Sequence, residues 1–270
     1  MRPLIVFSIT MSLVQIAAQA PDSRPEMGRS WGRSLDTRLT ELEAPPITAG
    51  RLSQLIPAPD VAAKSCCAYI DPMTSPPALQ TLLSDIAACR ACAGDLVPEP
   101  RPVVRVGLKT RLLICGQAPG RLVHKTGLPF NDPSGVRLRS WMGIDRDTFY
   151  DHPAIGVAAM AFCFPGTNPK GGDYPPPVRC AQLWRRQLLD QLPKVELTLL
   201  VGSYAQTWAL GDARKATMTE TVAAWTEYGP GILPLPHPSW RNTAWLKRNP
   251  WFEAEVTPYL RQRVEALLRA

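Results

Sequence analysis

The sequence has no internal repeat and no long uninterrupted hydrophobic run. Its N-terminal apolar stretch, residues 3–18, is interrupted by Ser8, Thr10, Ser12 and Gln15, and it is too short and too polar for a transmembrane helix. Seven cysteines are spread thinly over 270 residues. An odd and dilute set of this kind excludes a small disulfide scaffold, so we consider a metal or cluster site before a set of bridges.

The composition is otherwise that of a globular protein. Hydrophobic residues make up 45% and charged residues 20%, which excludes a disordered tail and a collagen-like polymer. The length fits one domain of roughly 150–200 residues plus an appendage. A net charge of +7 is compatible with a polyanionic partner, and 29 prolines predict long ordered loops.

Residues 1–78 are predicted to be an N-terminal extension, poorly ordered and rich in Pro, Ser, Ala and Arg. Residues 1–20 resemble an export leader that ends in Ala18-Gln19-Ala20. A start codon assigned too far upstream, with the true start at Met73, explains the same residues. The extension holds seven basic and seven acidic side chains, so the whole net charge belongs to the predicted domain, residues 79–270.

From residue 79 onward, apolar runs alternate with amphipathic segments. Strands are expected at 111–115, 155–162, 197–201 and 232–235, and helices at 79–93, 134–142, 180–192, 203–210, 219–225 and 251–268. The helix at 134–142 is expected to open on a serine cap. This alternation predicts an α/β domain with a mostly parallel sheet and helices on both faces. Chemistry in such sheets gathers beyond the carboxyl ends of the strands.

Two loops follow predicted strands. The first reads Gly116-Gln117-Ala118-Pro119-Gly120 and continues to Gly127-Leu128-Pro129-Phe130-Asn131. Its glycines let the backbone approach a ligand, although an ordinary turn after a strand has the same form. The second reads Pro236-His237-Pro238-Ser239-Trp240-Arg241-Asn242. A lone histidine is usually a filler, but prolines on both sides fix this one in place, which favours a functional role.

Four cysteines form a third group. Cys89 and Cys92 make a CxxC pair, and Cys163 and Cys180 flank a loop rich in Pro and Gly. Four such thiolates are able to hold an iron–sulfur cluster or a structural zinc. Cys115 ends a buried strand and is interpreted as an apolar filler. Cys66 and Cys67 lie in the extension and receive no role.

Taken together, GQAPG, GLPF, HPSWRN and the CxxC…C-x16-C pattern resemble the uracil-DNA glycosylase superfamily. The likeness covers about residues 79–268. It is strongest to the iron–sulfur family 4 group, whereas HPSWRN is similar to the His-Pro-Ser-Pro-Arg-Asn form of the single-strand-selective branch. The resemblance implies a three-layer α/β/α sandwich with a central four-stranded parallel sheet, and a [4Fe-4S] cluster on the four cysteines.

The resemblance also implies roles for individual residues. His237 corresponds to the histidine that hydrogen-bonds the departing base, Phe130 to the aromatic that stacks on it, and Asn131 lies beside Phe130 in the same motif. The backbone around Gln117 and Ala118 corresponds to the loop that walls the pocket. The residues implied in contacts to DNA are Gly120, Ser239, Trp240 and Arg241.

The chain departs from the family pattern at the water-handling position. Other branches have Asp or Asn where this chain has Ala118, and family 4 has Glu where it has Gln117, a side chain that orients water but is not a base. Asp132 is the nearest carboxylate able to assist, and it suits a helix cap or a turn equally well.

A second departure concerns recognition of the base. The segment 158–162 lacks the asparagine that reads the uracil edge in relatives. Asn131 and Asn168 are the candidates to replace it. Without such an amide, no residue is assigned to distinguish uracil from cytosine.

These residues predict a monofunctional DNA glycosylase that removes uracil or another deaminated base, acting as a monomer in the cytoplasm with DNA as partner and no membrane. Neither motif holds a lysine for Schiff-base chemistry. A second hypothesis is a glycosylase-like iron–sulfur protein that binds damaged or single-stranded DNA without efficient catalysis. A third, which depends on the leader alone, is an exported protein with zinc or disulfides.

Overall fold

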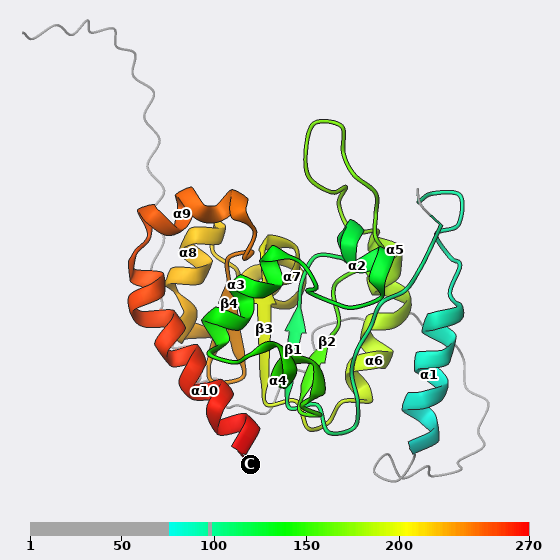
Figure 1. The fold of residues 1–270 in the computed structure, drawn as a ribbon, viewed down its shortest axis with the longest axis horizontal. Helices are drawn as coiled ribbons and strands as arrows, with labels where there is room; N and C mark the ends of the chain where they lie inside the picture. The colour runs from blue at the N-terminus through cyan, green and yellow to red at the C-terminus, as the bar shows by residue number, and fades with distance from the viewer. Residues whose placement is uncertain (1–75, 97–98, 270) are drawn as a thin grey trace, which may run out of the picture. The chain divides into compact units, whose positions relative to one another are not determined.

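A computed structural model of the chain describes residues 76–96 and 99–269 (Figure 1). The chain divides into two units, residues 1–66 and 67–270, and all described residues belong to the second. The leader-like residues and nearly all of the predicted extension lie outside the described residues. The helix expected to begin at residue 79 begins at Pro76 and ends at Ala88.

Helices and strands alternate along the described chain. The strands are β1 (Leu112–Cys115), β2 (Ile155–Val157), β3 (Leu197–Val201) and β4 (Ile232–Leu235). The α-helices are α1 (Pro76–Ala88), α2 (Arg121–Thr126), α3 (Pro133–Met142), α4 (Arg146–Asp151), α5 (Val178–Cys180), α6 (Arg186–Asp190), α7 (Ser203–Leu210), α8 (Met218–Ala223), α9 (Thr243–Arg248) and α10 (Thr257–Arg269). The π-helical and 3-10 segments are η1 (Ala181–Arg185), η2 (Gly211–Ala213), η3 (Trp225–Tyr228), η4 (Trp240–Asn242) and η5 (Phe252–Val256).

The four strands form one parallel sheet in the order β2-β1-β3-β4. Leu113 pairs with Gly156 on one side, and Ile114 pairs with Leu199 on the other. From β1 the chain crosses first to one side and then to the other, so a crevice is expected where the carboxyl ends of the strands meet. The predicted four-stranded parallel sheet is confirmed.

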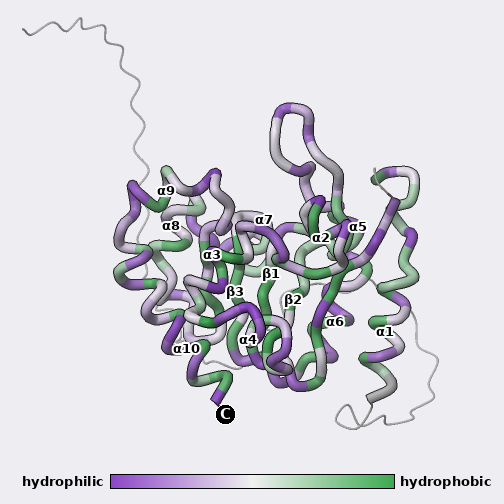
Figure 2. The backbone as a smooth tube through the Cα atoms, in the orientation of Figure 1, coloured by the Kyte–Doolittle hydropathy of each residue, from purple (hydrophilic) through white to green (hydrophobic). Residues whose placement is uncertain are grey.

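Alternate residues of the strands face two separate cores. Leu112 and Ile114 pack with Leu138 of α3 and Leu260 of α10, in a cluster that covers one face of the sheet. Leu113 and Cys115 pack with residues of α1 and α6 on the other face. Because successive side chains of a strand point to opposite faces, this partition defines three layers. Figure 2 shows the hydrophobic strands at the centre of the fold.

The second strand is shorter than predicted. It ends at Val157, and residues 158–162 leave the regular ladder. Arg185, which is buried, donates hydrogen bonds to the carbonyl oxygens of Ala158 (3.0 Å) and Ala159 (3.1 Å). These carbonyl groups therefore accept hydrogen bonds from the guanidinium group and not from a neighbouring strand.

The expected helix at 180–192 is present as a continuous segment from α5 through η1 to α6. Its middle turn, Ala181–Arg185, is π-helical and ends on the buried Arg185. The Arg185 guanidinium also donates to Cys115 Sγ (2.6 Å) and lies 4.5 Å from the ring centre of Trp208. This arginine therefore joins the end of β1 to the segment that follows β2.

The remaining differences lie at helix ends and in short helices. The cap of α3 is Asp132, whose Oδ1 accepts from the Gly135 N–H at 2.9 Å, so the prediction of a serine cap was wrong. The short helices α2, α4 and α9 were not predicted, whereas the equally short α8 corresponds to the helix expected at 219–225. A segment of about six residues seldom shows a repeating apolar period.

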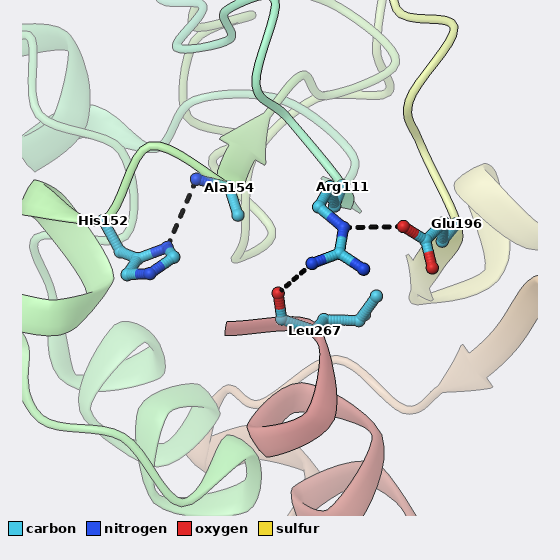
Figure 3. A network of polar contacts seen from close by, with 5 residues as sticks. All are labelled: Arg111, His152, Ala154, Glu196 and Leu267. Atoms are coloured by element: carbon cyan, nitrogen blue, oxygen red, sulfur yellow. Dashed lines mark hydrogen bonds and ion pairs between the residues drawn. The ribbon is translucent and has the colours of Figure 1, made fainter. Parts of the chain in front are cut away.

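A polar network closes the opposite, amino-terminal edge of the sheet (Figure 3). Arg111 donates to Glu196 Oε1 (2.6 Å) and to the carbonyl oxygen of Leu267 in α10 (2.8 Å). Nearby, His152 Nδ1 accepts from the N–H of Ala154 (3.3 Å). The contacts of Arg111 join the residues just before β1 and β3 to the last helix, and the His152 contact closes the turn before β2, so both are structural.

Candidate active site

A cavity of about 480 Å³ lies at the carboxyl end of the sheet, within the size range of ligand pockets. It is walled by the loop after β1, the start of α3, the end of β2, the loop after β4, and part of the loop that precedes α5. The predicted residues that line it are Gln117, Ala118, Gly120, Phe130, Asp132, His237, Ser239, Trp240 and Arg241. Among the described lining residues, Asn131 and Asn168 are absent.

The loop after β1 is tied to the segment after β2. The carbonyl oxygens of Gly116 and Gln117 accept from the N–H groups of Met160 (2.9 Å) and Ala161 (3.1 Å). Within the part of the chain that the structure describes, the N–H groups of Gln117 and Ala118 have no acceptor. Because both residues line the cavity, these amides are available to a ligand.

The side chain of Gln117 has a partner of its own. Its Nε2 donates to the carbonyl oxygen of Tyr174 at 3.0 Å. Tyr174 belongs to the loop between Cys163 and Cys180. The amide therefore fixes this loop against the wall of the cavity.

Phe130 is held in an uncommon backbone conformation. Its φ of 54° lies in the left-handed region, where residues with side chains are rare. Gly135 permits this arrangement, because a Cβ there would lie 1.7 Å from the Phe130 carbonyl oxygen. The Phe130 ring makes an edge contact with Phe149 and lies against Gly116. An aromatic surface is thus fixed in the cavity wall.

His237 is oriented by contacts of the loop that follows β4. Its Nδ1 accepts from the Ser239 N–H at 3.2 Å, and its carbonyl oxygen accepts from Asn242 Nδ2 at 2.7 Å. Burial is the main cause that lowers the pKa of His237, Arg241 lowers it further, and Asp132 opposes them. The lowered pKa favours the neutral ring, and the hydrogen bond accepted by Nδ1 assigns the remaining proton to Nε2. This N–H is a donor for a ligand in the cavity.

The rim of the cavity carries an exposed aromatic residue and a basic residue. The Trp240 residue is 72% exposed, and the Arg241 guanidinium lies 5.4 Å from the centre of its ring. Arg137 of α3 donates to the carbonyl oxygen of Ser239 at 2.9 Å, which holds the turn from behind. The rim therefore presents an apolar wedge beside a positive charge.

Other residues that line the cavity were not predicted from the sequence. Val103, Val157 and Ala159 form an apolar part of the wall, close to where an edge-reading amide was sought. Thr167, Gly172 and Asp173 come from the loop between Cys163 and Cys180. No sequence pattern signalled Asp173, because its place depends on how an irregular loop folds back.

The four predicted cysteines line a second, small cavity, which is otherwise surrounded by apolar side chains such as Ile86 and Phe162. Cys180 Sγ accepts from the Phe162 N–H, and Cys89 Sγ accepts from Trp184 Nε1, both at 3.3 Å. The cysteines of the described residues carry free thiols. The structure therefore brings together all four cysteines of the predicted set.

Burial and the neighbouring thiols raise the pKa of Cys163 to about 12, and burial raises that of Cys180 to about 11. Between residues 76 and 269, leaving out 97–98, no three His, Cys, Asp or Glu side chains converge closely enough for a single metal ion. The four thiols share the lining of one small cavity.

The parallel sheet, the cavity at its carboxyl edge and the histidine loop define an α/β protein of the kind that binds its ligand beyond the strand ends. A family model described as the uracil DNA glycosylase superfamily matches residues 105–261, which is more than half of the chain. The chain belongs to this superfamily. Across the described residues, no helix combines the length and the apolar character required to cross a bilayer.

We expect Gly135→Ala to destabilise the protein by about 2 kcal/mol or more, because the new methyl group would overlap the Phe130 carbonyl group. Urea unfolding followed by tryptophan fluorescence measures this change. Gly107→Ala is the matched control, because a Cβ there meets no atom within 4 Å. Equal stability of the two variants would contradict the described packing of Phe130.

We expect ¹⁵N NMR spectra at pH 7 to show His237 protonated on Nε2, with a titration midpoint below the ordinary value of about 6.5. A lowered folded pKa means that the unfolded state binds the proton more readily. The contribution of His237 to stability is therefore complete above about pH 6.5 and declines as the pH falls toward the folded pKa. In His237→Gln this part of the pH dependence should vanish. A proton on Nδ1 at pH 7 would contradict the geometry.

Proposed function

We propose that the protein is a DNA glycosylase that hydrolyses the bond between deoxyribose and uracil or another deaminated base. The observation that carries this proposal is the neutral His237, whose Nε2–H is available in a cavity shared with Phe130. Membership in the uracil DNA glycosylase superfamily supports it.

The cavity offers the contacts that excision of a base requires. A base in duplex DNA must first be extruded from the stack. Phe130 then provides a face for the base, and the free amides of Gln117 and Ala118 provide donors beside it. As the glycosidic bond breaks, negative charge grows on the base, and the Nε2–H of His237 stabilises its carbonyl oxygen.

The rim of the cavity suits the DNA backbone. The exposed Trp240 is proposed to fill the space left by the extruded base, and Arg241 beside it to neutralise a phosphate. Gly120 and Ser239 line the cavity beside them, and we propose that both contact the DNA backbone. The net charge of +7 favours association with DNA.

The reaction is proposed to stop at base removal. An associated strand cleavage would need an amine nucleophile, and no lysine lines the cavity among the described residues. Gln117 and Asp132 remain candidates for orienting the attacking water. Asp132 already holds the cap of α3 with one oxygen, whereas its other oxygen has no described partner.

We also propose that Cys89, Cys92, Cys163 and Cys180 hold a [4Fe-4S] cluster with a structural role, as in the family 4 group. Each thiolate of such a cluster binds a different iron, so the sulfurs surround a volume and do not meet at one ion. The shared apolar cavity and the two N–H donors to sulfur support this assignment. A thiolate-bound cluster and a DNA substrate together favour the cytoplasm, and a monomer is proposed.

The composition of the cavity wall favours a second function, DNA binding without efficient catalysis. The wall formed by Val157 and Ala159 offers no side-chain amide to read a base edge, and Ala118 offers no group for water. These features favour a protein that binds damaged or single-stranded DNA without efficient catalysis. The two functions differ in whether a base is released.

We expect His237→Ala to slow single-turnover release of uracil from an oligonucleotide by about 10²–10³-fold, because one donor to the developing anion is lost. DNA affinity should stay close to that of the wild-type protein. Substrates with hypoxanthine and xanthine identify the preferred base, and His152→Ala, at the opposite edge of the sheet, is the control. A wild-type protein that binds these oligonucleotides and releases no base would instead support the binding function.

Anaerobic purification of the full chain should give brown protein with about four iron atoms and matching sulfide per chain. We expect Cys163→Ser to lose this absorbance and iron and to unfold at a lower temperature, because the thiolate and its loop anchor are lost. Cys66→Ser, at a cysteine with no assigned role, should retain both. Colourless wild-type protein without iron would overturn the cluster.

A further inference from the structure

The loop between Cys163 and Cys180 contains an ordered hairpin, residues 166–174. Thr167 and Asp173 form an antiparallel bridge, and the Tyr174 N–H donates to the Gly166 carbonyl oxygen at 2.9 Å. Gly172 takes a positive φ of 84° at the tip. Figure 1 shows this segment rising beside α2 and α5. The hairpin has a defined shape although it contains no regular strand.

The hairpin places Asp173 in the cavity of the candidate active site. A Cβ on Gly120 would lie 3.8 Å from Asp173 Oδ2, so the carboxylate lies over the glycine that ends the loop after β1. The hydrogen bond from Gln117 to Tyr174, the next residue along, fixes the hairpin to the same loop. Asp173 therefore shares the cavity with His237 and holds a fixed position relative to the loop.

Charged groups from three elements face Asp173. Arg121 of α2 and Arg241 of η4 favour its ionised form, and Asp132 at the cap of α3 disfavours it. Burial, the largest influence, raises the pKa of Asp173 above its ordinary value. A carboxylate with a raised pKa is a better proton acceptor than an exposed aspartate. His237 lines the same cavity and stays neutral, so it does not neutralise this carboxylate.

Of the two carboxylates that line the cavity, Asp173 makes fewer hydrogen bonds to the described residues. Asp132 uses Oδ1 to cap α3, whereas no described donor hydrogen-bonds to either oxygen of Asp173. The Gln117 amide is directed to Tyr174, and Ala118 has no polar atom in its side chain. Asp173 is thus the carboxylate whose two oxygens can both accept hydrogen bonds from water.

We propose that Asp173 positions the attacking water and accepts its proton during base excision, because the loop after β1 supplies no base. This inference rests on the proposed glycosylase function. The bond between C1′ and the base nitrogen breaks, and its electron pair leaves with the base. The water oxygen forms the new bond to C1′, one water proton passes to Asp173, and that proton is then returned to the base anion.

The test compares single-turnover release of uracil by the full chain and by its variants. We expect Asp173→Asn to lower the rate by about 10²-fold or more while affinity for the same oligonucleotide carrying thymine is kept. Asp212→Asn, at an exposed aspartate without an ion pair among the described residues, should match the wild-type rate. A wild-type rate in Asp173→Asn, or a loss confined to DNA affinity, would overturn the proposal.

Chemical rescue separates a catalytic carboxylate from a structural one. We expect added formate to restore part of the rate of Asp173→Ala and none of the rate of His237→Ala, because only the first lacks a proton acceptor. Formate without effect on Asp173→Ala would count against the proposal. If wild-type protein releases base and His237→Ala does not, but Asp173→Asn is unaffected, only the role of Asp173 fails. If wild-type protein releases no base, the glycosylase function fails as well.

Discussion

The parallel pairing of β1 with both β2 and β3 is the constraint on which the rest of the structure depends. A central strand buried on both faces must be apolar throughout, and all four residues of β1 are buried. Parallel pairing also places every strand end at one edge, so loops that are distant in sequence meet there. The loop after β1 supplies free amides and the loop after β4 supplies His237. The cavity needs both loops, because each forms part of its wall.

The cysteine group and the candidate active site are joined through the same stretches of chain. The segment after β2 bonds to the loop after β1, receives the guanidinium of Arg185, and then reaches Cys163. The hairpin leaves Cys163, enters the cavity at Asp173 and returns to Cys180. A cluster on these cysteines would therefore fix both ends of one wall of the cavity, which is a reason for a structural cofactor without redox turnover.

Much of the fold was predictable because it depends on local patterns. The strands at 197–201 and 232–235 have the predicted bounds, since each is a short apolar run between turns. His237 and Phe130 were predicted from motifs, and both line the cavity. The left-handed backbone of Phe130 and the position of Asp173 were not predictable, because Gly135 and a folded-back hairpin impose them through space. For the same reason nothing in the sequence separated Asn131, which does not line the cavity, from Phe130 beside it.

The attachment of α10 has a consequence for synthesis of the chain. Leu260, Val264 and Leu267 complete the core that begins with Leu112, and Arg111 bonds to the Leu267 carbonyl oxygen. Arg111 and Leu267 are 156 residues apart, so this is a contact of high sequence separation. The larger core therefore stays incomplete during synthesis until residue 267 has left the ribosome, and until then α3 and its neighbours cover that apolar face of the sheet only in part.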